Sequence, residues 1–137
     1  MADVRRISDF YTKLANQVLD ENEELNFITE IGITIIFLES DQEKTSKGKI
    51  VLGQCEKVAE KYKWGIPCDF TITLFNPNLC MLSVEQIKRV LFHELLHVGI
   101  NKNGSLFVKP HDLEDFKLII DKFGTDWAKP EIPFSEN

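Results

Sequence analysis

Two histidines stand four residues apart in His93-Glu94-Leu95-Leu96-His97, and this spacing could place a metal ion. Residues four apart on a helix lie on one face, so both imidazoles can reach the same ion. Zinc favours imidazole ligands, and a catalytic zinc site takes three protein ligands and leaves a fourth position for water. Glu94 is not needed as a ligand and could accept a proton from that water as general base. The motif therefore predicts a catalytic zinc site with His93 and His97 as ligands.

A motif of this length can also arise by chance, in which case the two histidines would be ordinary core residues. The chain contains only three histidines, and the motif uses two of them. The motif also places three polar side chains among the apolar residues of segment 90–98. Burying polar groups without partners is costly, and a bound metal would satisfy them. These observations favour the zinc site.

The residues themselves leave the third ligand open. His111 is the one remaining histidine, fourteen residues after His97, and we favour it because it stands at the start of the next predicted helix. Glu114 is the main alternative, since some zinc peptidases take a carboxylate from a second helix. Asp112 is equally suited to orienting a ligand imidazole and to capping its helix. Two weaker candidates for the ligand are Asp115 and Cys55.

The predicted ligands require two helices to position them. Ser83 and Gln86 form a capping box, which predicts a helix that begins at residue 84 and runs through residue 98, where turn-forming residues follow. A short extended piece at 106–108 would lead into a last helix, whose apolar stripe spans 113–123 and which Gly124 would close. His111 would enter the site from the beginning of that helix.

The rest of the chain predicts an α+β fold. Apolar residues at spacings of three and four over 4–19 predict an N-terminal amphipathic helix. The basic run 44–49 is expected to be a solvated loop, and 76–78 is expected to be a turn. The segment 58–64 fits a strand, although 56–63 also fits a short helix. Three segments are expected to be strands, of which the last would be an edge strand: 31–38, 50–55 and 69–75.

Composition predicts one soluble domain over residues 1–137, because 43% of the residues are hydrophobic and 28% are charged. The net charge of −6 disfavours nucleic acid as a partner. The three cysteines form no Cys-x-x-Cys pair, which is typical of free thiols in a reducing compartment. No signal peptide and no apolar run of roughly 20 residues is visible, so we expect a cytoplasmic protein without a membrane span.

Beyond the zinc motif, the chain contains Lys109-Pro110-His111-Asp112-Leu113-Glu114-Asp115-Phe116 and then Phe123-Gly124-Thr125-Asp126-Trp127. Together these segments resemble the family described as putative phage metallopeptidases, which are small zincins of bacteria and prophages. The likeness runs from about residue 48 to residue 133. The order of parts is also similar to SprT-like proteases, in which a histidine at the start of the next helix is the third zinc ligand. The resemblance implies a zincin-like fold with an N-terminal helix, a small mixed sheet, a zinc-binding helix and a C-terminal helix, and it supports His111.

The expected activity is therefore zinc-dependent cleavage of a peptide or protein substrate, aligned along the strand at 69–75 by β-augmentation. The long metzincin motif is excluded, because Ile100 and Asn103 stand where it needs glycine and histidine. Two alternatives stay open. The metal could be purely structural in a non-catalytic module. The chain could also be a SprT-like protease acting on nucleic-acid-bound proteins through the basic run at 44–49, although the basic or cysteine-rich modules of such proteins are absent.

Overall fold

The computed structural model describes residues 4–110, and within them a four-stranded mixed sheet forms the frame of the molecule. Its order is β1-β2-β6-β5. The strands β2 and β6 are parallel, whereas β1 and β5 run antiparallel to their neighbours. The small mixed sheet predicted from the sequence is thereby confirmed. The bounds of these strands are β1 (Arg5–Ile7), β2 (Ile35–Ser40), β5 (Gly53–Lys57) and β6 (Phe70–Phe75).

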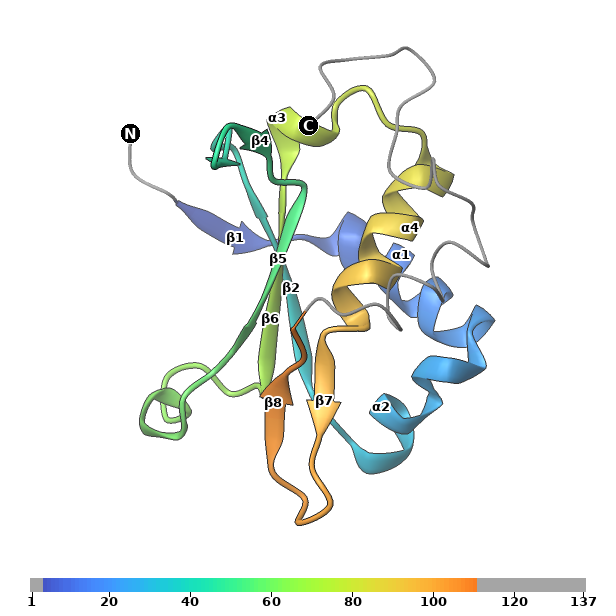
Figure 1. The fold of residues 1–137 in the computed structure, drawn as a ribbon, viewed down its shortest axis with the longest axis vertical. Coiled ribbons are helices and arrows are strands. Elements are labelled where there is room, and N and C mark those ends of the chain that lie inside the picture. Colours follow the sequence, from blue (N-terminus) through green and yellow to red (C-terminus); the bar gives the residue numbers. More distant parts are fainter. Residues whose placement is uncertain (1–3, 111–137) are drawn as a thin grey trace.

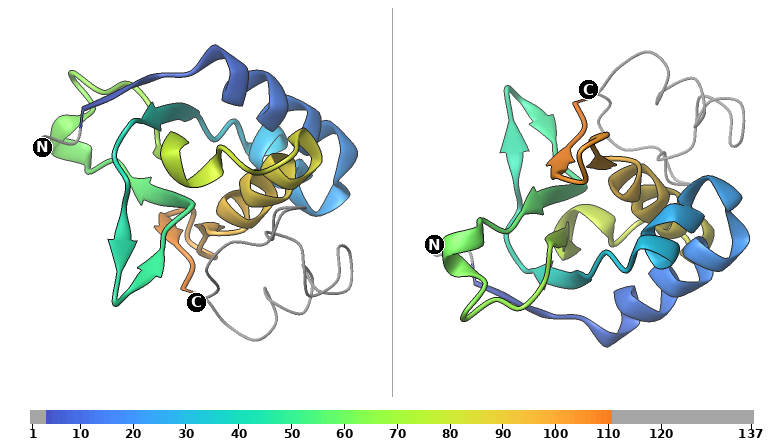
Figure 2. Two further views of the ribbon diagram at one scale, coloured as in Figure 1. Left: turned by 90° about the horizontal axis from the view of Figure 1, so that it is seen from above. Right: turned by 90° about the horizontal axis from the view of Figure 1, so that it is seen from below.

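The longer helices cover one side of this sheet, as Figures 1 and 2 show. They are α1 (Asp9–Glu21), α2 (Asn26–Ile31) and α4 (Val84–Leu95), and α1 packs against α4. The hydrophobic core lies between the two layers, so the fold is α+β. Smaller elements complete the described part: the hairpins β3 (Thr45–Ser46) with β4 (Lys49–Ile50) and β7 (Val98–Ile100) with β8 (Leu106–Val108), the helix α3 (Asn76–Leu79), and the 3₁₀ turns Glu23–Leu25 and Glu60–Tyr62.

The predicted N-terminal helix exists, but its predicted start is wrong. Ser8 is the N-cap of α1, and its hydroxyl accepts a hydrogen bond from the Tyr11 N–H at 3.1 Å. The residues before Ser8 form β1, which pairs with β2. Val4 and Ile7 match the helical spacing, yet they are 66% and 64% exposed and contribute nothing to the core.

The strand predicted from residue 31 begins later, at Ile35. Ile31 is still the last residue of α2, and Gly32 ends that helix with a left-handed φ of +84°. Its N–H bonds the carbonyls of the preceding turn, as in other helices that close on glycine. The apolar run therefore contains both the end of a helix and the start of a strand. Hydrophobic periodicity over only eight residues cannot distinguish a helical segment from a strand.

The prediction that segment 69–75 is an edge strand is wrong, because β6 lies between β2 and β5. The alternating threonines suggested a solvent-exposed face, but Thr73 is completely buried. Arg5 of β1 crosses this face and donates hydrogen bonds to Thr73 Oγ1 at 3.0 Å and to Glu56 at 2.7 Å. The edge strand next to β6 is β5, so alignment of a substrate along 69–75 is excluded.

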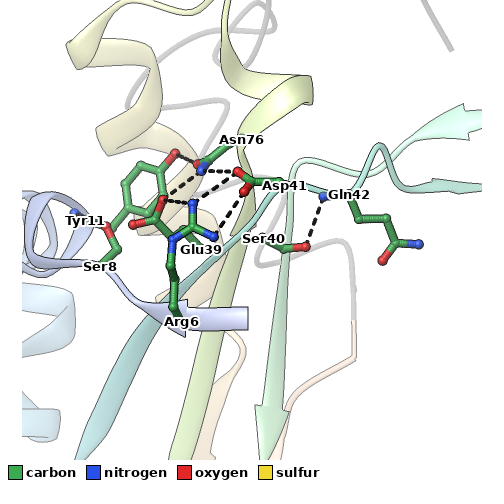
Figure 3. Close-up of polar contacts among 8 residues, drawn as sticks. All are labelled: Arg6, Ser8, Tyr11, Glu39, Ser40, Asp41, Gln42 and Asn76. Atoms are coloured by element: carbon green, nitrogen blue, oxygen red, sulfur yellow. Dashed lines mark hydrogen bonds and ion pairs between the residues drawn. The ribbon is translucent and has the colours of Figure 1, made fainter. Parts of the chain in front are cut away.

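A polar network fastens the N-terminal segment to the end of the sheet (Figure 3). The Tyr11 hydroxyl donates to Asn76 Oδ1 at 2.5 Å, and Asn76 Nδ2 donates to Glu39 at 2.8 Å. Arg6 forms ion pairs with Glu39 at 3.2 Å and with Asp41 at 3.0 Å. Burial, together with the charge of Glu39, raises the pKa of Tyr11 to about 12, so its hydroxyl stays a donor. The network holds β1 and α1 where β2 ends.

Several smaller predictions also meet the structure. The expected loop at 44–49 contains the β3–β4 hairpin, the ambiguous segment 58–64 contains a 3₁₀ turn, and the expected turn at 76–78 lies in α3. The extended piece at 106–108 is confirmed as β8. The helix predicted over 113–123 lies outside the described residues. Among residues 4–110, no helix is long and apolar enough to cross a membrane.

Candidate functional site

Helix α4 carries the predicted zinc-binding motif, and it begins where the capping box predicts. The Ser83 hydroxyl accepts from the Gln86 N–H at 3.2 Å, and the Gln86 side chain accepts from the Ser83 N–H at 3.0 Å. The predicted end is wrong: the helix stops at Leu95, with Leu96 as C-cap, and His97 stands in the turn that follows. The next three residues leave the helix because they pair with β8 as strand β7. The turn-forming residues 101–104 close that hairpin and not the helix.

His93 and His97 face each other even though the helix ends between them. Their ring centroids are 5.0 Å apart and their planes are nearly perpendicular, at 89°. Each side chain is only 8% exposed. Two imidazoles that bind one ion tetrahedrally, with metal–nitrogen bonds of about 2.0 to 2.1 Å, have ring centres roughly 5 Å apart. The separation of the two rings is therefore the one that a shared ion would require.

The main chain of Lys109 fixes the orientation of the His97 ring. His97 Nδ1 lies 2.5 Å from the Lys109 carbonyl oxygen, and because a carbonyl can only accept, Nδ1 carries the proton. His97 Nε2 is then the nitrogen with the lone pair, which is the arrangement that orients imidazole ligands in zinc sites. The Lys109 N–H also donates to the His97 carbonyl at 2.6 Å. Pro110 restricts Lys109 to an extended backbone, which keeps this carbonyl in place.

Glu94 is buried beside the two histidines, with 6% of its surface exposed. Burial raises the pKa of its carboxyl to about 8, because the carboxylate loses its hydration. A cation bound nearby would lower that pKa again. Such a perturbed carboxyl in a cleft is typical of a proton-transfer group.

The three motif residues open on one cleft of about 540 Å³. Its walls come from residues 50–55, which lead from the end of β4 into β5, from the C-terminal half of α4 with His97, and from residues 108–110 at the end of β8. The lining is mostly apolar, which suits an active site that excludes water. The apolar and backbone lining comprises Ile50, Val51, Leu52, Gly53, Cys55, Val90, Val108 and Pro110.

Cys55 was an open alternative for the third ligand, and its side chain does line the cleft. Burial raises the pKa of its thiol to about 12, and the charges of Glu94 and Glu56 add to the shift. Within the described part of the chain, no three His, Cys, Asp or Glu side chains are grouped so that they could hold a metal. Cys55 therefore does not complete a ligand set with the two histidines.

The structure thus brings three predicted site residues together, namely His93, Glu94 and His97. The third-ligand candidates His111 and Glu114 lie outside the described residues, as do Asp112 and Asp115. Sequence reasoning missed Lys109, which acts through its main chain and so has no side-chain signature. It also missed Gly53 of β5, which lies close to the Glu94 side chain. An isolated glycine in a strand is a known sign that another segment approaches the main chain closely.

Comparison with known proteins gives one family and no individual relative. A family model described as "Putative phage metallopeptidase" matches residues 6–131. The match begins well before residue 48. It therefore includes strands β2, β5 and β6 of the sheet as well as the motif. No curated protein and no solved structure matches the chain. Because the family model spans nearly all of the sequence, the chain belongs to the putative phage metallopeptidase family.

Proposed function

We propose that this chain is a zinc-dependent peptidase in which His93, His97 and His111 bind the metal and Glu94 is the general base. The observation that carries the proposal is the meeting of two suitably spaced imidazoles and one buried carboxyl on a single cleft. Membership in a metallopeptidase family supports the same reaction class. A helix carrying the motif beneath an edge strand also supports a zincin-like fold.

The path of the chain supports His111 over Glu114 as third ligand. The Lys109 main chain is bonded to the His97 ring, and Pro110 lines the cleft. Covalent geometry limits the Cα of the following residue to about 3.8 Å from that of Pro110. His111 directly follows Pro110 in the sequence, whereas two further residues, Asp112 and Leu113, precede Glu114.

The proposed chemistry divides between the metal and the protein groups. When bound, zinc supplies Lewis acidity, which polarises a carbonyl and lowers the pKa of water. Glu94 accepts the proton of the attacking water and passes it to the leaving amine nitrogen. His97 keeps its acceptor nitrogen available because Lys109 holds the opposite one as a donor. The apolar walls limit access of bulk water, which strengthens these interactions.

The register of the sheet supports β5 as the strand along which a peptide aligns. The Phe75 N–H donates to the Leu52 carbonyl at 3.1 Å, so this opposed pair is hydrogen-bonded across the strands. In an antiparallel ladder the next pair, Gly53 with Leu74, is then not hydrogen-bonded. The N–H and C=O groups of Gly53 and Cys55 consequently point away from β6, toward the edge of β5 that pairs with no other strand of the described residues. An extended peptide can pair with them by β-augmentation.

Metal analysis and a peptide assay test this proposal together. The purified protein should contain about one zinc ion, which His93→Ala and His97→Ala should each remove. Glu94→Gln should keep the zinc and the melting temperature, because it keeps size and hydrogen bonding. Its hydrolysis of a quenched-fluorescent peptide library should fall at least about 100-fold, since general-base catalysis contributes about 10² to 10⁴.

Two results would contradict the proposal. Hydrolysis by Glu94→Gln at the parent rate would show that Glu94 is not the base. A parent that cleaves no peptide but unfolds when a chelator removes its zinc would establish a structural metal instead.

A further inference from the structure

Gly53, the first residue of β5, packs so closely against its neighbours that no side chain fits there. A Cβ built on Gly53 would lie 2.7 Å from Leu74 Cδ2, 3.1 Å from Glu94 Cγ and 3.3 Å from Glu94 Cδ. Distances below 3.0 Å are essentially never found for real Cβ atoms. Because Gly53 has no side chain, the side chains of Glu94 and Leu74 can occupy the space beside its Cα.

Backbone conformation does not account for this glycine. The described glycines with positive φ are Gly32, Gly48 and Gly104, and Gly53 is not among them. An L-residue could adopt its backbone angles without strain. The requirement for glycine at position 53 is therefore steric, and it comes from the two side chains that the Cβ would meet.

Of these two neighbours, Glu94 is the easier one to displace. Leu74 is completely buried in the packed core, opposite Gly53 in the sheet. Side chains in a close-packed protein interior resist movement. Glu94 instead borders the cleft and has rotatable bonds beyond Cβ. A methyl group at position 53 would therefore push the Glu94 carboxyl away from β5.

We propose that Gly53 is a positioning residue: its lack of a side chain lets the β5 main chain lie against Glu94 and fixes the carboxyl beside the two histidines. The same residue directs its N–H and C=O toward the outer edge of β5. One residue thus sets the distance between the proton acceptor and the main chain along which the peptide aligns. The catalytic part of this inference rests on the proposed function, whereas the contact with Glu94 does not.

Gly53→Ala tests the inference, with Gly65→Ala as the matched control. A Cβ at Gly65 meets no atom within 4 Å, and its φ is not in the left-handed range. Misplacement of a reacting group by about 1 Å can cost roughly 100-fold in rate. We expect kcat of Gly53→Ala to fall about 10- to 100-fold, with KM within about threefold and zinc content unchanged. A kcat equal to that of the parent, or an equal loss in Gly65→Ala, would overturn the inference.

A double variant keeps the test decisive if Gly53→Ala folds poorly. Leu74→Val removes Cδ2, the nearest atom, while the contact with Glu94 remains. Gly53→Ala combined with Leu74→Val should melt at the temperature of Leu74→Val alone and still show the low kcat. If kcat instead returns to the value of Leu74→Val, the clash with Leu74 caused the loss and Glu94 is not being positioned.

A readout without turnover separates this inference from the proposed function. In metal-free protein labelled with ¹³C at glutamate Cδ, the Glu94 resonance can be assigned as the one lost in Glu94→Gln. It should move in Gly53→Ala and stay in place in Gly65→Ala. An unmoved resonance would overturn the role of Gly53 whatever the activity. A moved resonance with a parent that cleaves no peptide would remove the proposed function and leave Gly53 as the residue that places Glu94.

Discussion

The Nδ1 atom of the His97 imidazole is bonded to the main-chain carbonyl of Lys109. Nδ1 donates to the Lys109 carbonyl, and the Lys109 N–H donates back to the His97 carbonyl. The orientation of this proposed ligand therefore depends on how closely β8 and the residues after it follow β7. The nature of the side chain at 109 is of little importance to it.

Gly99→Ala should weaken zinc binding. A Cβ at Gly99 would lie 2.7 Å from Phe107 Cζ and 2.9 Å from Lys109 Cγ, so these side chains must shift, and we expect the shift to displace the Lys109 main chain from His97. Displacing a group that orients a metal-bound histidine typically costs about 10- to 100-fold in metal affinity. We expect a loss of at least about tenfold, measured by competition with a chromophoric chelator.

Lys109→Ala is the matched control for this first prediction. It removes the side chain and keeps the carbonyl, so zinc affinity should stay within about twofold of the parent. If Lys109→Ala weakens binding as much as Gly99→Ala does, the side chain and not the main chain supports the site.

His111→Ala should lower zinc affinity far more than Glu114→Ala. The chain enters the cleft at Pro110, directly before His111, and losing one of three protein ligands leaves an incomplete site. Equilibrium dialysis against buffered zinc gives both affinities. The opposite ranking would place the protein in the class whose third ligand is a carboxylate.

Cys55→Pro should impair peptide binding without disrupting the sheet. The Cys55 N–H points to the outer edge of β5, so proline removes a donor that no strand within residues 4–110 uses. One hydrogen bond is worth about 0.5–1.5 kcal/mol, which corresponds to a KM raised about two- to tenfold. Cys55→Ala keeps the N–H and controls for loss of the thiol. Equal KM values for the two variants would argue against alignment along β5.

Asp69→Asn should destabilise the fold in a pH-dependent manner. Burial alone would raise the pKa of Asp69, but hydrogen bonds from Thr34 and Lys63 outweigh it and lower the pKa. A lowered folded-state pKa stabilises the protein fully above the unfolded-state pKa of about 3.9, and this contribution disappears as pH falls through the folded-state value. Urea unfolding at pH 7 should show a loss of about 1 kcal/mol, because the ion pair is partly screened.

The difference between Asp69→Asn and the parent should shrink at pH values below the folded-state pKa of Asp69. Asp41→Asn is a suitable comparison, since Arg6 and Asn76 lower the pKa of that carboxyl too. Asp41 is exposed, so solvent should screen its contribution and the variant should unfold close to the parent. A loss for Asp69→Asn that is the same at pH 7 and at pH 2.5 would point to packing and not to charge.

Local sequence signals predicted the start of α4 but not its end. The capping box of Ser83 and Gln86 involves neighbours three residues apart, so the sequence contains all of it. The end after Leu95 depends on pairing of β7 with β8, which is a contact between segments. The interior place of β6 likewise depends on its pairing with β2 and β5, and Thr73 is covered by Arg5 from 68 residues away.

The candidate site likewise combines features that the sequence could predict with features that it could not. The spacing of His93, Glu94 and His97 predicted that they share one site, and the structure brings them to one cleft although His97 lies in the turn after α4. Lys109 contributes a carbonyl, which every residue possesses, and Gly53 contributes the absence of a side chain. Neither contribution can be recognised before the neighbouring strand is placed. The prediction of His111 is not tested by the described residues.

The two edges of the four-stranded sheet differ in how readily another chain could pair with them. On one side, β1 is only three residues long and carries Arg5 and Arg6, and short charged strands are poor templates for intermolecular pairing. By covering β2, it hides a six-residue strand that would otherwise present unpaired main-chain groups. Backbone pairing with β2 and the hydrogen bond from Arg5 to the buried Thr73 keep that cover in place. Detachment of β1 would therefore expose the edge of β2 and promote aggregation and fibril-like stacking. The candidate site beside β5, at the opposite edge of the sheet, would be unchanged.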